Sequence, residues 1–247
     1  FTGNPSPVTA AKNTVRSAET VLITHNQLAN IRTERPPNKS NIFLMLFVLC
    51  TFFVAHSAQD VALSSLSASR GFRIVGAAAG DESGFSVSNA GDVNGDGISD
   101  VIVGAYNANP SSGSDAGISY VIFGRDIAGG ATPFGDIQLT TSALPVSIGF
   151  RILGAAAIEN SGRSVSSAGD INGDGVDDII VGALWGDPPG GSNAGISYVI
   201  FGRSLNAQLA NPFGDIQLTT GVTVLPASTG FRILGFAVDD YSGWSVS

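Results

Sequence analysis

The chain has 247 residues and a formal net charge of −8 at pH 7. This acidity argues against nucleic-acid binding, which needs a basic surface. With 32 glycines and only 13% charged residues, the composition favours many short strands joined by tight turns over long solvated helices.

The first 58 residues differ in composition from the rest of the chain. Residues 1–41 are polar and contain several prolines, so we expect them to be disordered or to lie upstream of the true start of translation. The apolar run 42–55 falls short of the roughly 20 residues that a membrane-spanning helix needs, and small residues follow it. Segment 42–58 is therefore predicted to be a signal peptide. The alternatives are a membrane anchor, if the segment is not cleaved, and a buried strand.

Residues 71–247 consist of internal repeats, which set the architecture of the chain. Asp92 and Asp170 begin two acidic loops that match over nine residues, so the offset is 170 − 92 = 78 residues. Other segments recur in the same register: 71–76 with 149–154 and 230–235, 83–88 with 161–166 and 242–247, 116–125 with 194–203, and 133–141 with 212–220.

Each repeat contains four or five apolar or alternating segments of strand length. In the first copy we expect strands at 84–90, 100–106, 117–124, 136–140 and 149–154. Four or five antiparallel strands per repeat, without an amphipathic helix, predict an all-β chain of β-propeller blades behind a non-β N-terminal segment. The segments 136–140 and 215–219 leave room for an extra outer strand in each blade.

The sequence predicts an incomplete propeller ring. Blade one is expected at 84–155 and blade two at 162–236, with 71–76 as the outer strand of a preceding blade and 243–247 as the start of a third. Since the chain begins with a phenylalanine and breaks off inside a repeat, we expect a fragment. Unpaired sheet edges at either end predict association through those edges.

Each acidic loop concentrates oxygen ligands suited to a hard cation. Calcium binds six to eight oxygens, and alternate positions of each loop supply side-chain oxygens, a backbone carbonyl and a closing carboxylate. The predicted calcium ligands are Asp92, Asn94, Asp96, the Ile98 carbonyl and Asp100 in loop one, and Asp170, Asn172, Asp174, the Val176 carbonyl and Asp178 in loop two. The alternative is a hairpin turn rich in Asp and Asn without metal.

The loops are not EF-hands, because position 12 is valine instead of a bidentate glutamate. Together with the Ser-Gly-Phe-Ser-Val-Ser, Val-Ile-Val-Gly-Ala and Gly-Ile-Ser-Tyr-Val-Ile-Phe-Gly segments, they resemble the FG-GAP repeats of integrin α-subunit propellers and their bacterial relatives. The resemblance covers 71–247. It implies that each loop joins the first two strands of a blade and binds structural calcium. Tyr106 and Leu184 depart from the family, which often has proline there.

The resemblance implies a secreted or cell-surface calcium-binding propeller for adhesion or for recognition of an extracellular protein or glycan, with the partner on the face opposite the loops. The alternative is a non-catalytic module of a larger secreted hydrolase that degrades phospholipids or polysaccharides. We expect no enzymatic activity, because both histidines, His25 and His56, and the single cysteine lie outside the repeats and no Gly-x-Ser-x-Gly elbow occurs.

Three other residue types have simple expectations. Trp185, in a loop, is a candidate for contact with a partner. The phenylalanine of each Gly-Phe-Arg-Ile segment is expected in the core. The arginine that follows it is expected to face solvent or to pair locally. These residues are Phe72 and Arg73, Phe150 and Arg151, and Phe231 and Arg232.

Overall fold

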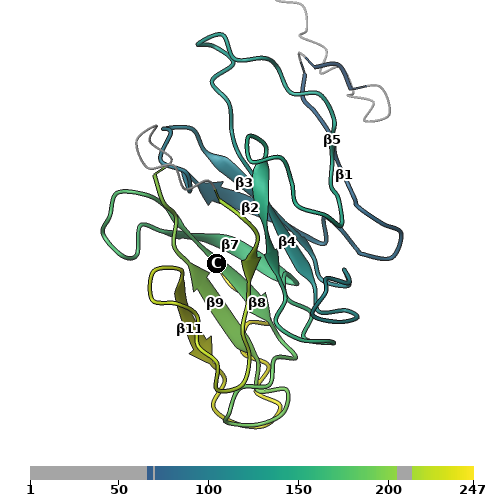
Figure 1. The fold of residues 1–247 in the computed structure, drawn as a ribbon, viewed down its shortest axis with the longest axis vertical. Helices are drawn as coiled ribbons and strands as arrows, with labels where there is room; N and C mark the ends of the chain where they lie inside the picture. The colour runs from purple at the N-terminus through teal and green to yellow at the C-terminus, as the bar shows by residue number, and fades with distance from the viewer. Residues whose placement is uncertain (1–65, 69, 205–212) are drawn as a thin grey trace, which may run out of the picture. The chain divides into compact units, whose positions relative to one another are not determined.

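The computed structural model describes residues 66–68, 70–204 and 213–247, which are coloured in Figure 1. These residues form strands, turns and loops, and none of them is helical. In this part of the chain there is accordingly no helix that could cross a bilayer. The polar segment 1–41 and the signal-peptide-like segment 42–58 lie outside the described residues, so those two expectations stay predictions.

The predicted four-stranded antiparallel blades are confirmed. In both repeats each strand pairs with the next, from the first strand to the fourth. Blade one consists of β2 (Ser86–Gly91), β3 (Asp100–Ala105), β4 (Ile118–Ile122) and β6 (Gly149–Leu153). Blade two consists of β7 (Ser164–Gly169), β8 (Asp178–Ala183), β9 (Ile196–Ile200) and β11 (Gly230–Leu234).

The middle strands of each blade form its core because they are apolar on both faces. All five residues of β4 and of β9 are buried. The central tyrosines, Tyr120 and Tyr198, are fully buried, and their hydroxyl groups donate to the carbonyl oxygens of Thr140 (3.2 Å) and Thr219 (3.0 Å). Each blade therefore buries a large aromatic ring and still satisfies its polar end.

The two blades pack with their inner strands β2 and β7 against each other (Figure 1). Glycine makes this close approach possible. A Cβ on Gly104 would lie 1.9 Å from the carbonyl oxygen of Gly162, and one on Gly182 would lie 2.1 Å from that of Gly243. The glycine in the repeated Val-Gly-Ala segment is thus required by contact with the following repeat.

The extra strands do not extend their own blades. Only two residues of each expected segment are strand, β5 (Ile137–Gln138) and β10 (Ile216–Gln217). Each lies parallel to the outer strand of the preceding repeat: β5 pairs with β1 (Ile74–Val75), and β10 pairs with β6. The fifth strand of blade one is therefore supplied by repeat two, and it is parallel where the rest of the blade is antiparallel.

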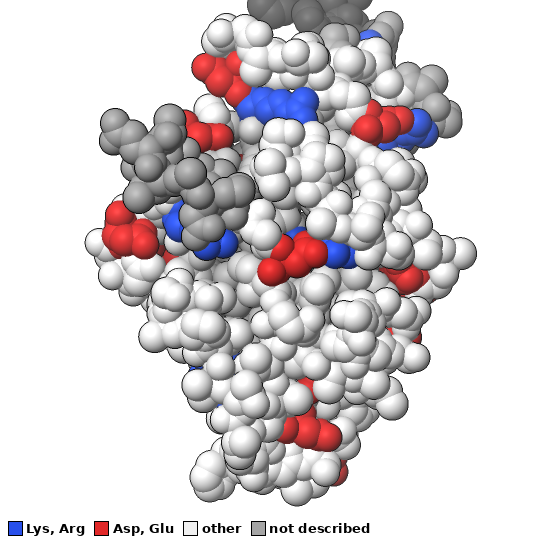
Figure 2. All heavy atoms as spheres, in the orientation of Figure 1, with Lys and Arg blue, Asp and Glu red and all other residues white. Residues whose placement is uncertain are grey.

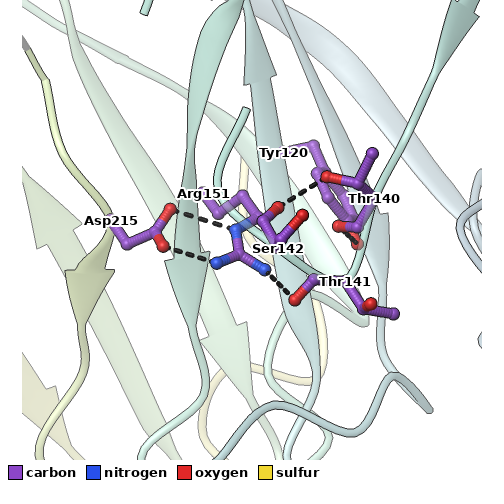
Figure 3. Close-up of polar contacts among 6 residues, drawn as sticks. All are labelled: Tyr120, Thr140, Thr141, Ser142, Arg151 and Asp215. Carbon is purple, nitrogen blue, oxygen red and sulfur yellow. Dashed lines mark hydrogen bonds and ion pairs between the residues drawn. The ribbon is translucent and has the colours of Figure 1, made fainter. Parts of the chain in front are cut away.

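Side chains reinforce this exchange between repeats. We call residues 134–141 and 213–220 the clamp segments. Arg151 on β6 donates from Nε to Oδ1 of Asp215 (3.0 Å) and from Nη1 to the Thr141 carbonyl (2.6 Å), as Figure 3 shows. Arg73 makes the equivalent ion pair with Asp136. The expectation that these arginines face solvent or pair locally is wrong for Arg151, whose side chain is 7% exposed and whose carboxylate partner lies 64 residues away. Arg73 faces solvent as expected, with its side chain 50% exposed, although it also pairs with a distant aspartate.

Candidate functional site

The first acidic loop joins β2 to β3 and is closed by its own side chains. The Asp92 carboxylate accepts hydrogen bonds from the amides of Asp96 (3.0 Å) and Gly97 (2.7 Å). Asn94 Oδ1 accepts from the Asp96 amide (2.9 Å), and Asp96 Oδ1 accepts from the Ile98 amide (2.8 Å). The side chains at positions 1, 3 and 5 thus curl toward the same stretch of backbone, which holds the loop in a tight turn.

Asp100 anchors the end of this loop at the start of β3. Its carboxylate is buried and accepts from the Val93 amide (3.0 Å) and the Gly124 amide (2.8 Å). The pKa of Asp100 is raised to about 6, mainly by burial and to a smaller extent by the charges of Asp96 and Asp92, while its two backbone hydrogen bonds act to lower it. Negative charge is therefore costly here, and a nearby cation would offset that cost.

The second loop repeats this arrangement between β7 and β8. The Asp170 carboxylate accepts from the amides of Asp174 (3.0 Å) and Gly175 (2.9 Å). Asp178 accepts from the amides of Ile171 (3.0 Å) and Gly202 (2.9 Å), and burial raises its pKa as well. The two loops have nearly the same internal geometry because they have nearly the same sequence.

The donor chemistry of both loops suits a hard cation, since every predicted ligand atom is an oxygen. Yet among the described residues no three His, Cys, Asp or Glu side chains are grouped so as to hold a metal. The carboxylates turn instead toward backbone amides, although a carboxylate has about four lone-pair sites and can accept more than one partner. The two calcium sites therefore stay predictions.

The sequence did not reveal that the two loops touch. The Asp92 amide donates to Asp177 Oδ2 (2.8 Å), and the Asp177 amide donates to the Asp92 carbonyl (3.1 Å). Blade two therefore covers loop one, and Asn94 is buried whereas its counterpart Asn172 is exposed. The one available signal was that Asp177 stands where loop one has Ser99, at a position that supplies no predicted ligand.

The opposite end of the blades carries exposed aromatic side chains around one arginine. The guanidinium of Arg163 lies over three rings, at 5.1 Å from the centroid of Phe85, 5.5 Å from Tyr106 and 5.0 Å from Trp244. Tyr241 joins the cluster through edge-on contacts with both tryptophans. We call this cluster the aromatic face: Phe85, Tyr106, Arg163, Trp185, Tyr241 and Trp244.

The strand pairing places the aromatic face away from the acidic loops. Phe85 precedes β2, whereas loop one follows that strand, and Ser86 pairs with Gly104 near the end of β3. Blade two has the same arrangement, so that Arg163 and Trp185 lie at the end opposite loop two. Phe85 and Trp244 are 53% and 57% exposed, which is unusual for large rings clustered in this way.

Comparison with known proteins agrees with this architecture. A family model described as the FG-GAP repeat matches residues 83–122 and 161–200. Integrin alpha-PS2 of Drosophila melanogaster is 31% identical over 171 residues, which is 66% of this chain. The chain is an FG-GAP repeat protein. It spans only 11% of the length of that integrin subunit, so the similarity concerns the repeats.

The matched segments of this FG-GAP repeat protein correspond to defined parts of its blades. Each match runs from just before the inner strand to the end of the third strand, and includes one acidic loop. The outer strands β6 and β11 and both clamp segments lie beyond the matched residues. The exchange of short strands between repeats is therefore built by sequence that the family model does not cover.

Proposed function

We propose that this FG-GAP repeat protein is an exported, non-enzymatic propeller module that recognises an extracellular protein or glycan, and that calcium stabilises it. The similarity to an integrin α subunit supports a role in adhesion or recognition at the cell surface. Two further features support the proposal: the signal-peptide-like segment 42–58, and the placement of acidic loops and aromatic face at opposite ends of the blades.

The aromatic face is the observation that carries the recognition role. Tryptophan, tyrosine and arginine are the residues that contribute most to binding at protein interfaces. Here Phe85, Arg163 and Trp244 come together because they occupy the same position of three successive repeats. Charged side chains, by contrast, are scattered over the face shown in Figure 2, with some adjoining pairs of opposite sign. The aromatic rings and their single arginine are thus better suited to contact a partner.

Calcium would bind at the end of the blades opposite the aromatic face, in the acidic loops. Asp92, Asn94, Asp96, Asp100 and the Ile98 carbonyl would hold it in loop one, and their counterparts would hold it in loop two. A bound calcium ion would neutralise the carboxylates and connect the end of the inner strand to the start of the next. In the structure Asp100 already connects these points through the Val93 and Gly124 amides, so a cation at the loop would stabilise a preformed turn.

Calcium binding is tested by calorimetric titration of the full chain, with thermal unfolding followed with and without chelator. We expect two sites and a calcium-dependent rise in Tm, because a ligand that binds only the folded state stabilises it. Asp92→Asn combined with Asp96→Asn should remove one site. Asp115→Asn, which removes one carboxylate outside the loops, is the matched control. If the wild type binds no calcium and its Tm does not respond to chelator, the loops are turns without metal.

Recognition is tested by adhesion of cells to the immobilised chain and by binding of soluble polysaccharides. Both tryptophans of the chain lie in the aromatic face, so intrinsic fluorescence reports directly on its occupation. Phe85→Ala with Trp244→Ala should abolish adhesion and leave the calcium response intact. Val146→Ala, at another exposed apolar side chain, should leave adhesion unchanged. Adhesion that survives loss of both rings would exclude the aromatic face as the binding surface.

A further inference from the structure

The two repeats contain matching pockets that lie outside both the acidic loops and the aromatic face. Pocket one has a volume of about 280 Å³, and pocket two has a volume of about 290 Å³. Each is formed between a clamp segment and the loop that precedes the outer strand of the same blade. Equivalent residues line the two pockets: Arg125, Asp136 and Pro145 in pocket one, and Arg203, Asp215 and Pro226 in pocket two.

Neither pocket is produced by an end of the chain. Pocket one is present although all of blade two follows it, and pocket two is present although all of blade one precedes it. The clamp segment that lines each pocket is also held in place by the strand beneath it. A pocket that stays open beside a complete following blade and beside a complete preceding blade is a property of the repeat itself.

Each pocket contains an arginine without an acidic partner. The Cζ atom of Arg203 lies 4.2 Å from the ring centroid of Phe213, and that of Arg125 lies 4.5 Å from the ring centroid of Phe134. The ion pairs found among the described residues use other arginines. Residues 205–212, which follow pocket two in the sequence, include no aspartate or glutamate. Stacking on a ring fixes the plane of a guanidinium and leaves its edge free to bind an anion.

The arginine of pocket two is partly desolvated. Its Nε atom is buried and has no hydrogen-bond partner among the described residues. Burial also lowers the pKa of Arg203. A buried donor without a partner costs free energy, which a bound anion would recover. A carboxylate suits this position well, because its two oxygens match the planar fork of a guanidinium.

An aspartate supplies each pocket with a hydrogen-bond acceptor beside the cation. Asp136 and Asp215 pair with the arginine of the strand beneath them, as Figure 3 shows for Asp215, and their side chains stay 41% and 25% exposed. A carboxylate has about four lone-pair sites, so each aspartate can also accept a hydroxyl group. Ser228 and Thr229 add hydroxyl groups to pocket two. The pockets therefore suit a ligand that carries one carboxylate and several hydroxyl groups.

We propose that each pocket binds one uronic acid residue of an acidic polysaccharide. Arg125 or Arg203 would bind the sugar carboxylate, and the aspartate of the same pocket would accept a hydrogen bond from a sugar hydroxyl group. Matching pockets in successive repeats favour a polymer of repeating units over an acidic peptide, whose carboxylates need not recur at a fixed interval. The pocket volumes lie near the lower limit for ligand sites, which suits a single sugar residue.

Calorimetric titration of the full chain with oligogalacturonate and with oligoglucuronate tests this proposal. The methyl esters of the same oligosaccharides are the matched control ligands, because they lack the negative charge and keep the hydroxyl groups. The buffer contains no added calcium, since uronates bind that ion themselves. We expect at least one of the two acids to bind, and its methyl ester to bind about tenfold or more weakly because the charge-assisted pair with arginine is lost.

Substitutions locate the binding site. Arg203→Ala should weaken binding about tenfold or more, and the double variant with Arg125→Ala should abolish it. Arg232→Ala removes the same charge outside both pockets and should bind like the wild type. Phe85→Ala with Trp244→Ala should also leave uronate binding unchanged. This last variant separates the proposal from recognition by the aromatic face, because either one can fail without the other.

Several results would overturn the proposal. A wild-type chain that binds neither acid has no such site. Equal affinity for an acid and its methyl ester would show that the carboxylate is not recognised. Binding that the double variant retains uses another surface. The comparison of acid with ester uses the unaltered protein, so it holds whether or not the variants fold, and circular dichroism and Tm identify a variant that does not.

Discussion

The outer strands β6 and β11 have the same six residues and different surroundings. In β6 the phenylalanine and the isoleucine are buried by Phe213 and Ile216 of the following repeat, whereas in β11 the matching side chains are exposed. Both strands pair with their own blade in the same register. The local sequence thus specifies the strand and its register, while burial and the energy that comes with it depend on whether another repeat supplies a clamp segment.

The largest expected effect comes from the phenylalanine at this position. Phe150→Ala should lower the free energy of unfolding by about 3–5 kcal/mol, because it leaves a cavity beside Phe123 and Phe213. Phe231→Ala should cost about 1 kcal/mol, since that ring is already in contact with water. Urea unfolding of both variants measures the difference. Equal losses would mean that the clamp does not stabilise the strand beneath it.

Substitution of the arginine in the same motif should also destabilise β6 more than β11, by a smaller margin than substitution of the phenylalanine. Arg151→Ala should cost about 2–3 kcal/mol, because it removes charge-assisted hydrogen bonds and leaves the partly buried Asp215 without its partner. Arg232→Ala should cost about 0.5 kcal/mol, since Arg232 forms no ion pair with any carboxylate among the described residues. Unfolding at low protein concentration makes the comparison. A large loss for Arg232→Ala would show that its bonds to Thr219 and Gly221 contribute more than an edge position suggests.

The smallest expected effect concerns the acidic residue that follows each outer strand. Glu159 follows β6, is buried near Thr220 at the end of the clamp segment, and has its pKa raised above 4.5 mainly by burial. Asp240 follows β11 and is exposed. Because the folded state holds the Glu159 proton more tightly than the unfolded state, its contribution to stability is complete below pH 4.5 and is lost as pH rises through the folded pKa.

Glu159→Gln should therefore flatten the pH dependence of stability above pH 4.5. The measurement is the urea midpoint of wild type and variant across that range. Glu82→Gln, at an exposed glutamate, is the matched control and should follow the wild type. A variant with the wild-type pH profile would show that Glu159 does not titrate differently in the folded and unfolded states.

Much of the fold could be predicted because the copies of the repeat within this chain can be aligned with one another. The expected strands at 100–106, 117–124 and 149–154 differ from β3, β4 and β6 by one or two residues at their ends. The acidic loops lie between the first and second strands of each blade, as the resemblance implied. Apolar runs of strand length bounded by glycine and aspartate are strong local signals. The calcium ligands of those loops stay predictions.

The errors concern contacts between repeats. The extra strand at 136–140 was expected to widen its own blade and instead covers the preceding one, and Arg151 was expected to find a local partner or solvent. Asp177 was also not predicted as a contact, and of the aromatic face only Trp185 was named as a candidate contact residue. In each case the partners lie in different repeats, so no local pattern records which of several identical motifs they will meet.

The sequence by itself determined the repeat, the strands and the tight acidic loops, because these depend on local periodicity and turn chemistry. The tertiary structure alone decided which repeat covers which strand. Identical Gly-Phe-Arg-Ile-Leu-Gly segments become core in β6 and surface in β11, since burial is a property of the neighbour that packs on a strand and is not encoded in the strand itself.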